Sequence, residues 1–164
     1  KDFSDVADDN WAADAVAFVS ASELFSGTTE TTYSPNDRMT RAMLMTVLAR
    51  LEGKDTDTGS TWYEEGMNWA VENGISDGTN PNGSITREQL ATMLWRYAGS
   101  PAGNGSLTAF SDADQVSDYA GAALCWAVEQ GIVSGRDNGA LDPQSDATRA
   151  EVAAMLMRFI ANVL

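Results

Sequence analysis

The chain has 164 residues, of which 43% are hydrophobic and 21% are charged, so it can bury a core in one domain or in a compact array of small units. Its net charge of −14 argues against nucleic acid and anionic membrane surfaces as partners, and no stretch approaches the roughly 18 apolar residues of a membrane-spanning helix. It contains no histidine, which excludes histidine-dependent catalytic triads and zinc sites, and its single cysteine, Cys125, excludes an internal disulfide.

The first predicted element of each of three repeats is a helix. Residues 18–27, 69–78 and 126–135 align with one another, and each segment starts with an aromatic residue and ends with glycine. A second aromatic residue stands seven positions earlier in every copy, so the two lie on one helical face. The pattern predicts a helix of about three to four turns, ending near a glycine that suits a left-handed cap.

The aromatic residues of this helix have two interpretations. At helical spacing they are usually core, and we expect this for the leading aromatic of each aligned segment: Phe18, Trp69 and Trp126. For the earlier aromatic of each pair, core is again the common outcome, but an exposed ring could stack on the face of a sugar. These residues are Trp11, Trp62 and Tyr119.

A loop rich in turn residues follows. The sequence Tyr-Ser-Pro-Asn-Asp at 33–37 matches Leu-Asp-Pro-Gln-Ser at 141–145 position for position, whereas repeat two shortens the loop to 79–84. A Thr-Arg pair ends each loop and opens the second predicted helix.

The second helix of each repeat carries one apolar stripe. Counting from its threonine, offsets 4, 7, 8 and 11 are apolar in every copy. The stripes are Leu44, Val47, Leu48 and Leu51; Leu90, Met93, Leu94 and Tyr97; and Val152, Met155, Leu156 and Phe159. A unit with one stripe cannot bury it alone, so the copies should pack together. We therefore predict an all-α fold in which three helix-loop-helix repeats, at 1–53, 60–99 and 108–164, form one compact monomer.

The threonines are predicted to cap the second helices. Thr148 and Glu151 have the spacing of a capping box, as do Thr86 and Gln89. Thr40 is predicted to cap as well, but its partner position holds Met43, which we expect not to reciprocate.

Capping leaves the adjacent arginines unexplained. Arg41, Arg87 and Arg149 each stand in a first helical turn, where a cation opposes the helix dipole. One interpretation is an anion site, formed by free helix amides with a guanidinium beside them. The other is an internal ion pair with a carboxylate such as Asp5 or Asp112. A second set of arginines repeats near the C-termini of the second helices, where we interpret their charge as favourable to the helix dipole. These are Arg50, Arg96 and Arg158.

Two acidic loops at 55–59 and 112–114 lack the full spacing of a calcium loop and are interpreted as solvated turns. No pair of carboxylates stands out as catalytic, so we predict no enzymatic activity, no cofactor and no metal site.

The ordered set of motifs resembles the S-layer homology domain in three tandem copies covering nearly the whole chain. The shared features are an opening Phe-x-Asp, an aromatic-led helix, a Gly-Ile/Leu-x-x-Gly segment, a proline loop and a Thr-Arg-Ala-Glu motif. The resemblance implies a pseudo-threefold trimer of repeats around a central three-helix bundle, with grooves between repeats. It also implies an extracellular module that anchors a bacterial surface protein to a secondary cell-wall polymer, often one carrying pyruvylated N-acetylmannosamine.

The resemblance further implies which residues contact the glycan. The motif arginines would meet the pyruvate carboxylate, with the opening aspartates and the groove aromatics beside them: Arg41, Arg87, Arg149, Asp5, Asp112, Trp11, Trp62 and Tyr119. Only repeat three keeps the full motif, at 148–151, and repeat two lacks the Phe-x-Asp opening. These departures leave open a second interpretation, a protein-interaction scaffold that has lost its glycan site.

Overall fold

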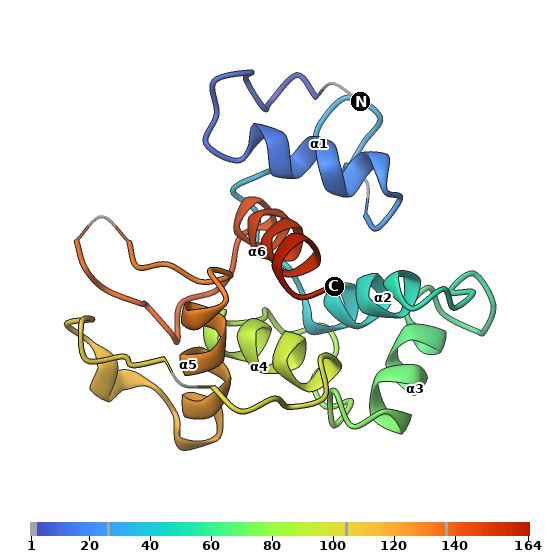
Figure 1. Cartoon of the computed structure of the whole chain (residues 1–164). Coiled ribbons are helices and arrows are strands. Elements are labelled where there is room, and N and C mark those ends of the chain that lie inside the picture. Colours follow the sequence, from blue (N-terminus) through green and yellow to red (C-terminus); the bar gives the residue numbers. More distant parts are fainter. Residues whose placement is uncertain (1–2, 26, 104, 137) are drawn as a thin grey trace.

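A computed structural model describes residues 3–25, 27–103, 105–136 and 138–164. Within these residues every regular element is helical, which confirms the predicted all-α class (Figure 1). The elements are α1 (Ala13–Ala21), α2 (Arg41–Leu51), α3 (Glu64–Glu72), α4 (Arg87–Tyr97), the short 3-10 helices η1 (Ala113–Gln115) and η2 (Asp118–Ala120), α5 (Gly121–Glu129) and α6 (Arg149–Asn162). None of the described helices has the length and apolar character that crossing a membrane requires.

The first helix of each repeat is shorter than predicted. Helices α1, α3 and α5 have nine residues each, about two and a half turns, instead of three to four. They begin after the earlier aromatic of each pair, because Trp11 and Trp62 lie in turns and Tyr119 lies in the 3-10 helix η2. In repeat one, Asn10 accepts a hydrogen bond from the amide of Ala12 at 2.8 Å, an Asx turn around Trp11.

The predicted left-handed cap is present in all three repeats but uses glycine in only two. Gly74 and Gly131 have φ values of +69° and +72° directly after the C-caps of α3 and α5. Glu23 takes the same conformation after α1, with φ of 58°. A side chain is strained in this region, so repeat one ends its first helix at a cost that the other two avoid.

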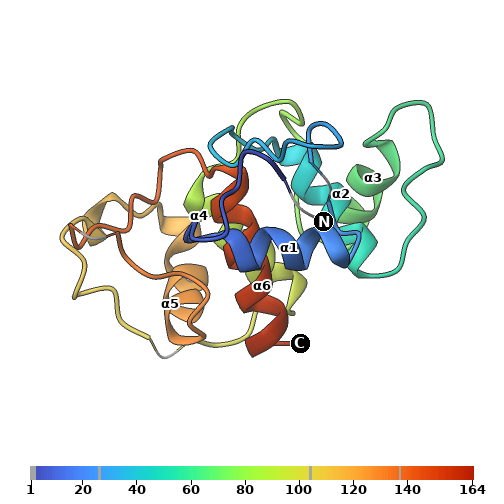
Figure 2. The same cartoon turned by 90° about the horizontal axis from the view of Figure 1, so that it is seen from above.

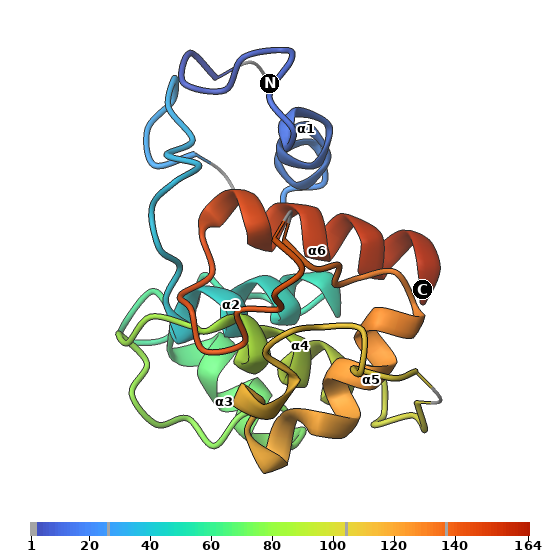
Figure 3. The same cartoon turned by 90° about the vertical axis from the view of Figure 1, so that its left-hand side faces the viewer.

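Each first helix packs against the second helix of the preceding repeat. The closest helix pairs are α3 with α2, α5 with α4, and α1 with α6. Figures 1 and 2 show α1 crossing over α6 at a steep angle, so the first repeat closes onto the last. Figure 3 shows that α1 covers the side of α6 that faces away from α2 and α4. The repeats are therefore joined in a closed cycle.

A ring of three backbone hydrogen bonds joins the segments that lead into the second helices. The amide of Met39 donates to Ala147 at 3.2 Å, Ala147 donates to Ile85 at 2.8 Å, and Ile85 donates back to Met39 at 2.8 Å. One such bond from each repeat to another is the pattern expected of threefold related units.

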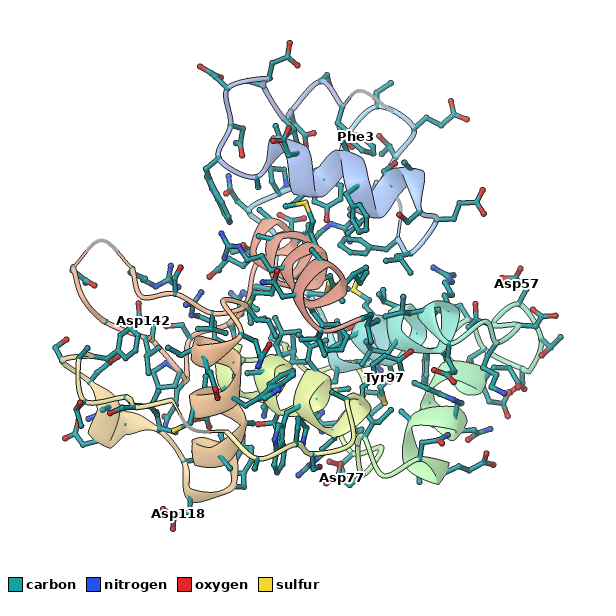
Figure 4. The ribbon with its side chains drawn as sticks, viewed as in Figure 1. Phe3, Asp57, Asp77, Tyr97, Asp118 and Asp142 are labelled. Atoms are coloured by element: carbon teal, nitrogen blue, oxygen red, sulfur yellow. The ribbon has the colours of Figure 1, made fainter. Side chains whose placement is uncertain are left out.

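The second helices supply the centre of the core. The six inward residues at offsets 4 and 8 are fully buried, each with 0% exposure: Leu44, Leu48, Leu90, Leu94, Val152 and Leu156. At the C-terminal end of α4, the ring centroid of Tyr97 lies 5.9 Å from that of Phe159. The hydroxyl of Tyr97 donates to the carboxylate of Glu52 at 2.7 Å. Tyr97 thus connects α4 with α6 and with the end of α2, where Figure 4 shows it.

Candidate ligand-binding groove

The three threonines occupy the N-cap positions of the second helices. The hydroxyl of Thr148 accepts from the amide of Glu151 at 3.1 Å, and Glu151 Oε1 accepts from the amide of Thr148 at 3.2 Å. Thr86 and Gln89 repeat this pattern. The expectation that Met43 cannot reciprocate was wrong, because its sulfur accepts from the amide of Thr40 at 3.4 Å. A thioether is a weak acceptor, so this capping box is the weakest of the three.

The helix amides that the anion-site interpretation required are not free. The first two amides of α6, from Arg149 and Ala150, donate to the carbonyls of Asp37 and Pro35 at 2.8 and 2.9 Å. The amides at the same two positions of α2 and α4 donate to carbonyls in the proline loop of the following repeat. A neighbouring loop therefore satisfies these donors, and the prediction of free helix amides was wrong.

Arg149 lies inside the protein. Its side chain is 3% exposed, its Nε donates to the carbonyl of Tyr33 at 2.8 Å, and its guanidinium lies 4.7 Å from the Tyr33 ring and 5.4 Å from the Phe25 ring. Burial lowers the pKa of Arg149 despite the nearby Tyr33, Asp37 and Asp5. The motif arginine of the best-preserved repeat therefore holds repeat one to repeat three.

The other two motif arginines make the same backbone contact. Arg87 Nε donates to Leu141 at 2.8 Å, and Arg41 Nε donates to Thr79 at 3.0 Å. Their other nitrogens differ, because Arg87 Nη1 pairs with Glu151 and Arg41 Nη2 lies 3.4 Å from Asp77. The internal ion-pair interpretation therefore holds for Arg41 and Arg87, although their direct partners are Asp77 and Glu151. Asp112 and Asp5, which the sequence suggested, act on Arg87 and Arg149 through their charge. The partner that all three arginines share is a carbonyl of the next repeat.

Asp5 and Asp112 hold the loops in place. The carboxylate of Asp5 accepts from the amides of Tyr33 and Ser34, both at 2.8 Å. Asp112 accepts from the amides at 141 and 142, at 2.8 and 3.0 Å. The amide of Leu141 is the main cause that lowers the pKa of Asp112. For Asp5, burial acts to raise the pKa, but the two amides outweigh it and the pKa is lowered.

The earlier aromatics are on the surface, so the core interpretation was wrong for them. Trp11 is 66% exposed, Trp62 56% and Tyr119 49%. Their surroundings differ. The hydroxyl of Tyr119 donates to the carboxylate of Glu88 at 3.1 Å, and Trp62 lies edge-on to Tyr63 at 5.2 Å between ring centroids.

The leading aromatics are in the core, as expected. Trp69 is 8% exposed and Trp126 is 2% exposed, and Phe18 is partly buried against the core.

Trp11 stands at the rim of a groove with a volume of about 600 Å³, here called the Trp11 groove. Repeat one contributes Trp11 and Asn36, repeat two contributes Arg87, and repeat three forms the remaining wall with residues 132–136, Thr148, Glu151, Ala154, Met155 and Arg158. Three of the eight arginines in the chain line this groove: Arg87, Arg136 and Arg158. The groove therefore concentrates positive charge in an acidic protein.

Arg136 is a groove residue that the sequence reasoning missed. It pairs with Asp142, which Figure 4 shows on the repeat-three loop, and its Nη2 lies 3.4 Å from Glu151 Oε2. The detectable signal is a departure from the repeat pattern, since repeats one and two have Thr28 and Thr79 at this offset.

Arg158 was assigned to the helix dipole, and the structure contradicts this. Helices α2 and α4 end one residue after Arg50 and Arg96, but α6 continues to Asn162. Arg158 therefore lies before the last turn, where the dipole contributes little.

The family model of the S-layer homology domain matches residues 2–42, 54–91 and 109–153. An amylopullulanase of Thermoanaerobacterium thermosulfurigenes is 35% identical over 95% of this chain and 9% of its own length. Exoglucanase XynX of Acetivibrio thermocellus is 31% identical over 94% of the chain and 16% of its own length. A surface-layer 125 kDa protein of Lysinibacillus sphaericus is 31% identical over 57% of the chain and 10% of its own length.

A solved structure has a similar fold. The undecaheme cytochrome from the S-layer of Carboxydothermus ferrireducens matches 90% of the chain with a TM-score of 0.51 and 22% identity, over 20% of its own chain. This likeness supports the fold alone. The family model covers well over half of the chain in three successive segments, so the chain belongs to the S-layer homology family as three tandem copies of its domain.

Proposed function

We propose that this chain is an extracellular module that anchors a bacterial surface protein non-covalently to the cell wall by binding an anionic, pyruvylated secondary cell-wall polymer. The Trp11 groove is the binding site. The observation that carries the proposal is that three of eight arginines line one groove beside an exposed tryptophan, in a chain of charge −14. Such a groove suits a sugar that carries a carboxylate, because the indole offers a flat apolar face and the arginines offer charge.

Among the residues that the structure describes, the surroundings of Trp62 and Tyr119 differ from those of Trp11. Near Tyr119, the buried carboxylate of Glu88 accepts from the tyrosine hydroxyl, and Arg41 lies close to Asp77. Arg149 is buried beneath aromatic rings, so its charge is not presented to a ligand. The equivalent helix position holds Ala42 in repeat one and Ala150 in repeat three, so the carboxylate is particular to repeat two. These differences favour one working groove among the three.

The relatives support an anchor whose cargo varies. Two are named as polysaccharide-degrading enzymes and one as a surface-layer protein, yet each matches this chain over only 9% to 16% of its own length. A module shared by proteins with such different names fits an attachment role better than a catalytic one. The chain would therefore bind the wall while another part of its protein acts.

The test is a pull-down with purified secondary cell-wall polymer, before and after chemical removal of its pyruvate. We expect retention on the intact polymer and loss on the depyruvylated one. Trp11→Ala should weaken retention by roughly tenfold, whereas Trp62→Ala, a matched change at another exposed tryptophan, should leave it unchanged. Retention that does not depend on pyruvate would overturn the proposal and favour the protein-interaction scaffold.

A further inference from the structure

Arg158 differs from the two arginines at the same offset of the other repeats. Arg50 Nη1 donates to the carbonyl of Leu24 at 3.2 Å, and Arg96 Nη1 donates to that of Ile75 at 3.3 Å. Each of these two arginines therefore connects the second helix to the end of the first. Within the described part of the chain, Arg158 has no hydrogen bond or ion pair, although it is half-buried in the wall of the Trp11 groove.

The other charges of the groove are already paired. Glu151 Oε2 contacts both Arg87 and Arg136, and Arg136 also pairs with Asp142. The carboxylates of Glu151 and Asp142 thus compensate the charges of Arg87 and Arg136, and neither of them pairs with Arg158. A half-buried guanidinium has lost part of its hydration, and an anion that enters the groove can replace it with charge-assisted hydrogen bonds.

We infer that Arg158, and not one of the motif arginines, binds the carboxylate of the glycan, and that the chain binds one such ligand. This inference rests on the proposed function. Trp11 lies on the repeat-one side of the groove and Arg158 on α6, so the ligand lies between two repeats. A pyruvate ketal bridges two oxygens of one sugar and carries its carboxylate on the bridging carbon, so a single sugar residue can offer a face to Trp11 and an acid group to Arg158.

The test is a thermodynamic cycle measured by calorimetric titration. The probes are the methyl glycoside of pyruvylated N-acetylmannosamine and the same glycoside without pyruvate. The protein is wild type or Arg158→Gln. Wild type should bind one equivalent of the pyruvylated probe about 10- to 100-fold more tightly than the plain one, the range for a hydrogen bond to a charged group. Arg158→Gln should bind both probes with nearly equal affinity.

Arg96→Gln is the matched control, because Arg96 stands at the same offset but is bonded to a carbonyl. It should lower stability in urea and keep the wild-type preference for pyruvate. If wild type shows no preference between the probes, the proposed function fails. If wild type prefers the pyruvylated probe and Arg158→Gln retains that preference, or if two or three equivalents bind, this inference alone fails. A urea titration of each variant shows whether it is folded.

Discussion

An arginine at the first position of a helix opposes the dipole of that helix, so three of them in equivalent places need a reason outside it. The structure supplies one in each case, because the Nε atoms of Arg41, Arg87 and Arg149 donate to carbonyls of a neighbouring repeat. The guanidinium is well suited to this, since it can bind a carbonyl with Nε and still offer its outer nitrogens to another group.

Arg149→Ala should therefore destabilise the protein without affecting the proposed glycan site. We expect a loss of about 2–4 kcal/mol in the free energy of unfolding, from the lost hydrogen bond of a charged donor and the lost contacts with two aromatic rings. Urea denaturation measures it. Arg38→Ala is the control, because that side chain is 71% exposed and should change stability by less than about 0.5 kcal/mol. A stable Arg149→Ala variant with weakened glycan binding would contradict this assignment.

Asp112 should make stability depend on pH in the acid range. Its carboxylate accepts two loop amides, which lower its pKa in the folded protein below the value of about 3.9 in an unfolded chain. The stabilisation is thus present above pH 4 and is lost as the pH falls through the lowered pKa. Asp112→Asn should cost about 1 kcal/mol at pH 7, and the difference from wild type should shrink near pH 3. Urea midpoints at both pH values test this, and an unchanged difference would show that the charge is unimportant.

At the scale of elements, the end of α1 carries a strain that α3 and α5 avoid. Glu23→Gly should raise the free energy of unfolding by about 0.5–1 kcal/mol, because glycine takes a φ of 58° without steric cost. Gly74→Ala is the reverse experiment. An added Cβ there meets no atom within 4 Å, so its expected loss of about 1 kcal/mol reports on the backbone alone. Thermal unfolding of both variants measures the effect, and equal stability of all three proteins would exclude backbone strain.

The elements themselves followed from periodicity and capping. The stripe at offsets 4, 7, 8 and 11 places a second helix in each repeat, and its residues are buried or partly buried as expected. The same periodicity misled at Trp11, since a seven-residue spacing cannot reveal that a turn at Asn10 delays the start of α1 until Ala13. The exposure of this tryptophan therefore could not be predicted from its spacing to Phe18.

The groove was harder to predict than the helices. Its walls come from all three repeats, and Trp11 and Arg158 are 147 positions apart in the sequence. Which arginine is paired depends on carbonyls and carboxylates that only the folded chain brings together. A motif match indicated a role for Arg149, but contacts across repeats decide whether its charge reaches the surface.

For the whole molecule, the charge of −14 and the arginines of the Trp11 groove predict opposite effects of salt on folding and on binding. Repulsion among carboxylates destabilises the compact state, so NaCl raised from about 10 to 150 mM should increase the free energy of unfolding by roughly 1 kcal/mol. The same salt should weaken binding of the pyruvylated glycoside by roughly two- to fivefold, because it screens the attraction to the arginines. Denaturation and titration in matched buffers provide both numbers. If added salt raised both the stability and the glycoside affinity, or lowered both, the result would contradict this account.

The closed cycle also affects how the protein folds. In an open array of repeats, each unit contacts only its neighbours, and units at the ends can unfold alone. Here α1 packs on α6, and Tyr33 bonds to Arg149 across 116 positions of sequence, so neither terminal repeat has a free outer face at this junction. The chain must bring its two ends together before this interface contributes stability, which predicts slow folding for a helical protein of this size. Unfolding should then be a single all-or-none transition. The proposed binding to the cell wall would therefore persist until the whole module unfolds.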